Sequence, residues 1–281
     1  MISAASSAAQ PVAFVLTGGA SYGALQVGML QALTQSGIRA DLVVGTSAGA
    51  LNAAAYAADP TPAGLARLAG AWENAKRAKI FSPHAADLLP AVLGRRDHLI
   101  SSDGLRSWLF AQLELDALEH AVIPLHVIAT DLETGQPEVL STGDALTALL
   151  ASCAVPGLFP PVRREGQLLV DGGISADTPV PQARELGAAT VYVLPTHAVG
   201  PAPWPRTAAR LGLHAYNQIS AHWTDDRVAA SDATVHLIPA PQLNWISPLN
   251  LSASAELVAA GKSSAERWLA SRVASRFAVA A

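Results

Sequence analysis

Short apolar runs alternate with helical repeats along the first sixty residues of the chain. The run Val12–Leu16 is rich in strand-forming residues and ends at a glycine pair, which predicts a buried strand followed by a tight loop. Apolar residues then recur at helical spacing over 25–33, a second apolar run covers 41–44, and an alanine-rich helix is expected over 48–58. Strands that alternate with helices in this way predict a parallel sheet with helices on its faces.

The same alternation continues toward the C-terminus. Further strands are expected over 125–129, 138–140, 168–170, 190–194 and 235–239. Further helices are expected over 143–152, 179–186, 211–230 and 254–271. We therefore expect a single α/β domain over residues 8–281, preceded by a disordered segment of residues 1–7.

Composition narrows the class of partner and of chemistry. The 281 residues are 51% hydrophobic and 14% charged. A formal net charge of −4 gives no indication of a basic surface that would bind nucleic acid. Cys153 is the single cysteine, so no intrachain disulfide can form. The eight histidines show no metal-ligand spacing, and we expect neither a metal nor a cofactor.

Nothing in the pattern predicts export or a membrane span. The first ten residues lack the cationic and apolar regions of a signal peptide. No apolar run reaches the roughly 18 residues that a spanning helix needs. We expect a cytoplasmic protein with at most transient, peripheral contact with a membrane surface. The apolar part of 83–100 is interpreted as core or, alternatively, as a mobile flap that touches lipid. The pattern leaves the oligomeric state open.

The turn after the second predicted strand carries the first candidate chemistry. Gly45, Ser47 and Gly49 fit the pattern G-x-S-x-G, which places a serine on a sharp strand-to-helix turn. Flanking glycines let the two backbones pass closely, and the N-terminus of the helix favours negative charge beside the serine. The position of the motif between an apolar strand and a helix favours a nucleophile elbow.

The glycine-rich loop after the first strand has three interpretations. It comprises Gly18, Gly19, Ala20, Ser21, Tyr22 and Gly23. Its glycines can simply permit unusual backbone angles at a helix entry. A nucleotide-phosphate loop is disfavoured, because the spacing of G-x-G-x-x-G is broken and no ribose-binding acid ends the next strand. In the third interpretation, closely spaced N–H groups form an oxyanion hole.

A carboxylate follows a later strand. Asp171 comes directly after the run 168–170 and is followed by Gly172 and Gly173. An Asp-Gly turn is the ordinary interpretation of such a sequence. However, the carboxyl ends of parallel strands share one edge of a sheet, where sites collect. We therefore expect Asp171 to meet Ser47 in space.

Together these motifs resemble the patatin-like phospholipase family. The similar stretches are 14–24, 44–53, 129–135, 151–162 and 169–173, in the family's order. The resemblance implies a three-layer α/β/α fold with a mostly parallel central sheet. It also implies hydrolysis of acyl ester bonds in lipids by a Ser–Asp dyad without histidine.

The resemblance carries over to single residues. Ser47 matches the nucleophile and Asp171 its acid/base partner, while Gly18, Gly19 and Ala20 match the oxyanion loop. Tyr22 is a departure, because the family often has arginine or lysine there. Its presence puts a preference for an anionic phospholipid head group in doubt.

Two rival hypotheses remain. One is an α/β-hydrolase with a Ser-His-Asp triad, in which the histidine follows the acid in the chain. The candidate histidines would be His197, His214, His222 and His236. The other is a lipid- or nucleotide-binding module that keeps the fold without catalysis.

Overall fold

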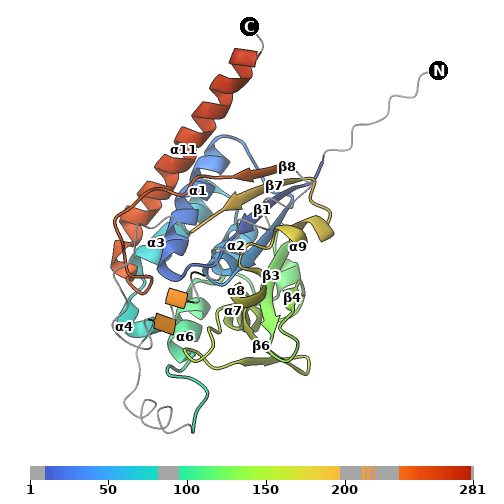
Figure 1. Cartoon of the computed structure of the whole chain (residues 1–281), viewed down its shortest axis with the longest axis vertical. Coiled ribbons are helices and arrows are strands. Elements are labelled where there is room, and N and C mark those ends of the chain that lie inside the picture. The colour runs from blue at the N-terminus through green and yellow to red at the C-terminus, as the bar shows by residue number, and fades with distance from the viewer. Residues whose placement is uncertain are drawn as a thin grey trace, which may run out of the picture.

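The computed structural model describes residues 10–81, 95–196, 211–212, 214–215, 218 and 234–279, with side chains as far as residue 272. Within these residues an eight-stranded sheet has the order β5-β6-β3-β2-β1-β7-β8, and β4 pairs with β3 (Figure 1). The expectations for residues 1–7, for most of 83–100 and for most of the helix over 211–230 lie outside the described residues.

All seven strands expected from the apolar runs form, and the structure adds an eighth, β5, that was not expected. They are β1 (Val12–Leu16), β2 (Leu42–Thr46), β3 (Leu125–Asp131), β4 (Pro137–Leu140), β5 (Val162–Arg164), β6 (Gln167–Asp171), β7 (Thr190–Leu194) and β8 (Thr234–Leu237). The pairs that join β3, β2, β1, β7 and β8 are parallel. Antiparallel pairs join β4, β5 and β6 to the end of the sheet. The predicted mostly parallel sheet is therefore confirmed.

Helices follow most of the strands, as the alternation predicted. They are α1 (Gly23–Gln35), α2 (Ala48–Ala58), α3 (Pro62–Asn74), α4 (Arg77–Ile80), α6 (Asp103–Gln112), α7 (Ala145–Ser152), α8 (Gly173–Ala176), α9 (Val180–Glu185) and α11 (Ser254–Val279). Short 3-10 turns are η1 (Ala20–Tyr22), η2 (Leu118–His120) and η3 (Leu251–Ala253). None of the helices in the described residues has the length and apolar character needed to cross a membrane.

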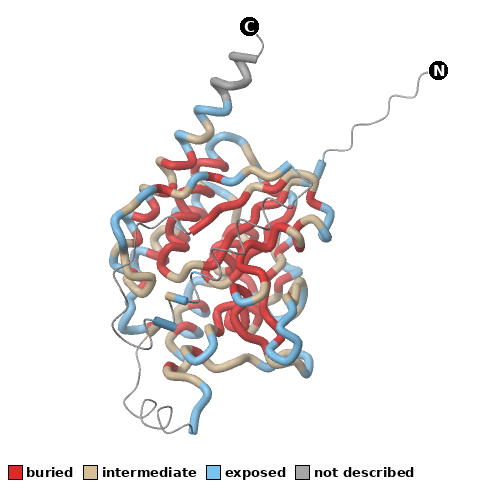
Figure 2. Tube along the Cα trace, in the orientation of Figure 1, coloured by how far each residue is buried: buried red, intermediate tan, exposed pale blue. Residues whose placement is uncertain are grey.

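Two apolar cores lie on opposite faces of the sheet. Phe14 and Leu16 of β1 belong to the larger core, together with residues of α1, α2, α3, α7 and α11. Ala13 and Val15 alternate with them and pack on the other face with residues of α8 and α9. Figure 2 shows the buried residues gathered along the strands and the inner sides of the helices. The expected three layers are therefore present.

The direction of β6 corrects one premise of the sequence analysis. Asp171 was expected beside Ser47 because both would end strands of a parallel sheet, but β6 runs antiparallel to β3. β4 pairs with one side of β3 from Val127 to Thr130. On the other side β2 pairs as far as Ile128, and β6 pairs from there onward. The ends of β2 and β6 therefore meet head-on along the same side of β3.

Candidate active site

Ser47 occupies a strained turn between β2 and α2. Its φ of 53° and ψ of −125° lie outside the regions that a non-glycine residue ordinarily adopts. A Cβ at Gly49 would lie 2.2 Å from the carbonyl oxygen of Leu16, so only glycine lets the start of α2 pass the end of β1. The Ser47 N–H donates to Ser152 Oγ at 2.8 Å, and that hydroxyl donates to the Ile128 carbonyl at 2.6 Å. Ser152 thus anchors the turn to β3.

Asp171 lies within hydrogen-bond distance of the serine. Ser47 Oγ donates to Asp171 Oδ2 at 2.8 Å, and the Gly173 N–H donates to Oδ1 at 2.8 Å. Asp171 is fully buried. A Cβ at Gly172 would lie 2.3 Å from the Ile128 carbonyl oxygen, so glycine allows the chain to turn tightly against β3. The backbone therefore fixes the carboxylate with one oxygen toward Ser47.

The glycine-rich loop also comes close to Ser47, since a Cβ at Gly18 would lie 3.3 Å from Ser47 Cβ. Gly18, Gly19 and Ala20 line the same cavity as Ser47. Gly19 has a φ of 154° and Ala20 a φ of 49°, so the loop is sharply bent where it faces the serine. Within the described residues, the N–H groups of Gly19 and Ala20 donate to no protein acceptor. Two backbone donors thus lie at the wall of the cavity that holds the hydroxyl.

A buried chain of side-chain amides holds this loop at both ends. Trp72 Nε1 donates to Asn52 Oδ1 at 2.7 Å, and Asn52 Nδ2 donates to Gln26 Oε1 and to the Gly23 carbonyl, each at 2.8 Å. Gln26 Nε2 donates to the Thr17 carbonyl at 2.8 Å and to the Leu194 carbonyl at 2.9 Å. Gln26 and Asn52 have no exposed surface. Neither was predicted from the sequence, although Asn52 is the one amide in the alanine-rich helix α2.

A late segment of the chain braces the same loop from outside. The Ser21 N–H donates to the Pro248 carbonyl at 3.0 Å, and Tyr22 Oη donates to the Ile246 carbonyl. Burial raises the pKa of Tyr22 to about 12, so its hydroxyl stays protonated and remains a donor. Tyr22, at the position where the family often has arginine or lysine, is therefore a neutral side chain that donates a hydrogen bond to the backbone of this chain.

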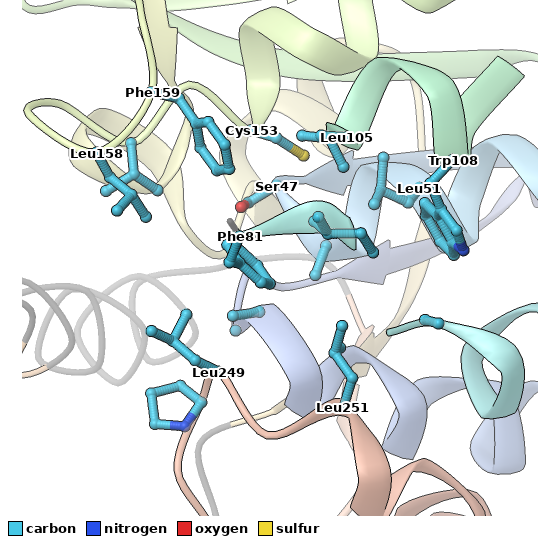
Figure 3. A pocket seen from close by; sticks show the side chains of 18 of the residues that line it. Ser47, Leu51, Phe81, Leu105, Trp108, Cys153, Leu158, Phe159, Leu249 and Leu251 are labelled. Carbon is cyan, nitrogen blue, oxygen red and sulfur yellow. The ribbon is translucent and has the colours of Figure 1, made fainter. Parts of the chain in front are cut away.

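An apolar cavity of about 100 Å³ opens beside Ser47 (Figure 3). Aliphatic and aromatic side chains form most of its wall: Leu51, Phe81, Leu105, Trp108, Leu158, Phe159, Leu249 and Leu251. Cys153 also lines it, and burial together with the charge of Asp171 raises the pKa of the thiol well above its usual range. A thiol that stays protonated is a poor nucleophile, so Cys153 is a weaker candidate nucleophile than Ser47.

The histidines of the triad hypothesis are not found beside Ser47 in the described residues. His236 of β8 packs against the rings of Tyr192 and Trp268, with centroids 4.8 and 6.2 Å away. β8 is three strand positions from β2, or about 14 Å across the sheet. His214 makes no described contact with Ser47, and His197 and His222 lie outside the described residues. In the described part of the chain, no group of three or more candidate ligands could hold a metal ion.

Comparison with known proteins shows that the region containing most of these residues matches one family. A family model described as patatin-like phospholipase matches residues 14–184, more than half of the chain. Lysophospholipase nte1 of Aspergillus terreus is 33% identical over 185 residues, which are 65% of this chain and 12% of that protein. Patatin-like phospholipase domain-containing protein 7 of Mus musculus is 28% identical over 188 residues, which are 65% of this chain and 13% of that protein.

This chain thus spans about an eighth of the length of these two curated relatives. Among solved structures, VipD from Legionella pneumophila is similar with a TM-score of 0.48 and 16% identity, over 92% of this chain and 66% of that one.

Proposed function

Because this chain belongs to the patatin-like phospholipase family, we propose that it hydrolyses carboxylic ester bonds of lipids through Ser47 and Asp171. The observation that carries the proposal is the 2.8 Å hydrogen bond from Ser47 Oγ to Asp171 Oδ2, at the wall of an apolar cavity. The geometry satisfies the requirement that a general base lie within hydrogen-bond reach of the proton it removes.

In the first half of the reaction, Ser47 attacks the ester carbonyl. Asp171 accepts the hydroxyl proton as the new C–O bond forms, because an ordinary carboxylate is too weak a base to ionise an alcohol beforehand. The tetrahedral intermediate collapses, the alcohol leaves with that proton, and the acyl group remains on Ser47. The strained backbone of Ser47 supports this role, since it holds the hydroxyl in the cavity before substrate arrives.

In the second half, Asp171 removes a proton from water as the water attacks the acyl-enzyme. The proton then returns to Ser47 Oγ when the fatty acid leaves, which restores the starting state. In both halves negative charge develops on the carbonyl oxygen. We assign its stabilisation to the N–H groups of Gly19 and Ala20, with Gly18 shaping the loop. One such donor is typically worth about 10²–10³ in turnover.

The shape of the cavity supports an acyl substrate. Its apolar wall can bury a hydrocarbon chain, and each buried CH₂ group contributes about 0.8 kcal/mol. We therefore propose phospholipase A, lysophospholipase or esterase activity toward lipid esters, with transient contact with a lipid surface. Tyr22 supplies no positive charge to the loop, so we expect no strong requirement for an anionic head group.

An alkyl fluorophosphonate probe tests the nucleophile directly. We expect the probe to label the wild-type chain at Ser47 and to abolish hydrolysis of nitrophenyl esters and lysophospholipid. Ser47→Ala removes both labelling and hydrolysis. Ser264→Ala is the matched control, because Ser264 is buried and donates to the Pro239 carbonyl at 2.6 Å, away from the cavity. Ester hydrolysis that survives Ser47→Ala would refute the proposal.

The same assay separates the rival hypotheses. A triad enzyme must lose activity when its histidine is replaced, whereas the dyad predicts that glutamine at His197, His214, His222 or His236 leaves hydrolysis nearly unchanged. A binding module without catalysis would retain lipid but would neither react with the probe nor release fatty acid.

A further inference from the structure

A second cavity of about 210 Å³ lies behind the one that contains Ser47. Leu51 and Trp108 line both cavities, so their side chains form the wall between them. Beyond that wall the second cavity is lined largely by aliphatic residues, including Leu68, Leu109 and Leu149. The first cavity therefore ends at a two-residue wall, and a second space with a partly polar lining lies behind it.

The wall is held in place from both sides. Leu51 projects from α2, the helix that begins at Ser47, and Trp108 projects from α6. The ring of Trp108 packs edge-on against that of Trp72, with centroids 6.0 Å apart, and Trp72 is tied through its indole N–H to Asn52. In Figure 3 Leu51 and Trp108 lie side by side at one end of the cavity, away from Phe159 and Leu158.

Part of the second cavity is polar. Arg67 and Glu114 line it and pair at 2.9 Å, with side chains 51% and 59% exposed. Solvent therefore reaches this polar part of the cavity. A hydrocarbon chain that passed Trp108 would run between aliphatic side chains toward this charged rim.

We propose that Trp108 and Leu51 form the end wall of the acyl site and set the longest acyl chain that the enzyme accepts. The inference rests on the proposed ester hydrolysis at Ser47. On this view the cavity behind this wall is a latent extension of the acyl site, closed by the Leu51 side chain and the Trp108 indole ring. An apolar cavity of about 150 Å³ accommodates benzene, so the 210 Å³ behind Trp108, part of which is polar, corresponds to at most about eight carbon atoms.

The chain-length profile of Trp108→Ala tests the wall. Esters with acyl chains from two to about eighteen carbons are hydrolysed by wild type and variant, and kcat/KM is plotted against length. We expect the variant's optimum to move to chains longer by about four to eight carbons. Over that range its kcat/KM should rise about three- to fourfold for each added CH₂ group that becomes buried, while the wild-type value falls or stays level.

Two further variants localise the effect. Refilling the second cavity with Ala71→Leu in the Trp108→Ala background should move the optimum back toward shorter chains, because Ala71 lines only that cavity. Trp245→Ala is the matched control, since Trp245 is 40% exposed and lines neither cavity. If Trp108→Ala does not fold, Trp108→Leu replaces it, with a smaller shift in the same direction.

The outcomes are distinguishable from failure of the proposed function. An unchanged optimum in a folded, Ser47-dependent Trp108 variant overturns the wall and leaves ester hydrolysis standing. An equal shift in Trp245→Ala also overturns it, because the effect would then not be local. If no ester is cleaved in a Ser47-dependent manner, the proposed function fails and this inference fails with it.

Discussion

Gln26 offers a sharp test of how the glycine-rich loop is held. Its side chain bridges the Thr17 and Leu194 carbonyls and accepts from Asn52, so it joins the end of β1, the end of β7 and helix α2. Gln26→Met keeps a side chain of similar length and removes every hydrogen bond of the amide. The variant therefore isolates the polar contribution from the packing contribution.

The structure sets the expected magnitude. The Leu194 carbonyl still accepts from the Thr17 N–H at 3.4 Å, but the Thr17 carbonyl and one Asn52 N–H lose a partner in the core. Each buried unsatisfied group costs about 1–3 kcal/mol, so we expect a loss of about 2–6 kcal/mol in the free energy of unfolding. A loop displaced by 1 Å can cost 10²-fold in rate, and we expect kcat to fall by about 10- to 100-fold with KM little changed.

Chemical denaturation and ester kinetics measure the two effects on the same samples. Gln182→Met is the matched control: Gln182 is also a buried glutamine, and its Oε1 accepts no hydrogen bond within the described residues. We expect that control to lose under about 1 kcal/mol and to keep its kcat. If Gln26→Met cost no more stability than the control and left kcat intact, the amide chain would have no role in holding the loop.

Three further predictions follow from single contacts. Asp171→Asn should lower kcat by at least about 10³-fold in steady-state assays, with KM and thermal stability nearly unchanged. The amide keeps the shape of the side chain but cannot accept the Ser47 proton. A folded variant with a tenth of wild-type kcat would contradict this prediction. Gly49→Ala should cost at least about 3 kcal/mol in denaturant titrations, because its Cβ would lie 2.2 Å from the Leu16 carbonyl oxygen; wild-type stability would contradict the close approach. Burial lowers the pKa of His126, so its imidazole stays neutral in the folded state. Stability should therefore fall as pH drops through about 6.5, where the same residue in the unfolded chain gains a proton. Denaturation at pH 7.5 and 5.5 should show a smaller fall in stability for His126→Gln than for wild type.

Much of the fold followed from local pattern. The apolar runs located β1 and β7 at their observed bounds, and the alanine-rich stretch located α2 from Ala48 to Ala58. The spacing of apolar residues in these elements, and the residues that bound them, can be read from neighbouring positions in the chain. The three-residue strand β5 and the four-residue helix α8 were not predicted, because elements this short show no recognisable spacing of apolar residues.

Some residues of the candidate site were likewise predictable from local sequence, and others were not. Ser47 and the glycines beside it were predicted because a tight strand-to-helix turn leaves its requirements in five adjacent residues. Gln26, Asn52 and the Tyr22 contact with the Ile246 carbonyl were not, because their partners are 26, 29 and 224 positions away in the chain. The lone amide Asn52 in the apolar helix α2 indicates a buried hydrogen bond, but the local sequence does not identify its partner.

By itself, then, the sequence determined the alternating elements, the strained serine turn and the family. Only the tertiary structure decided how Asp171 reaches Ser47, since β6 pairs antiparallel with the end of β3 and meets β2 head-on. The direction of a strand depends on hydrogen bonds between distant backbones, which leave no local pattern in the chain. For the same reason only the packed side chains reveal that Leu51 and Trp108 line two neighbouring cavities.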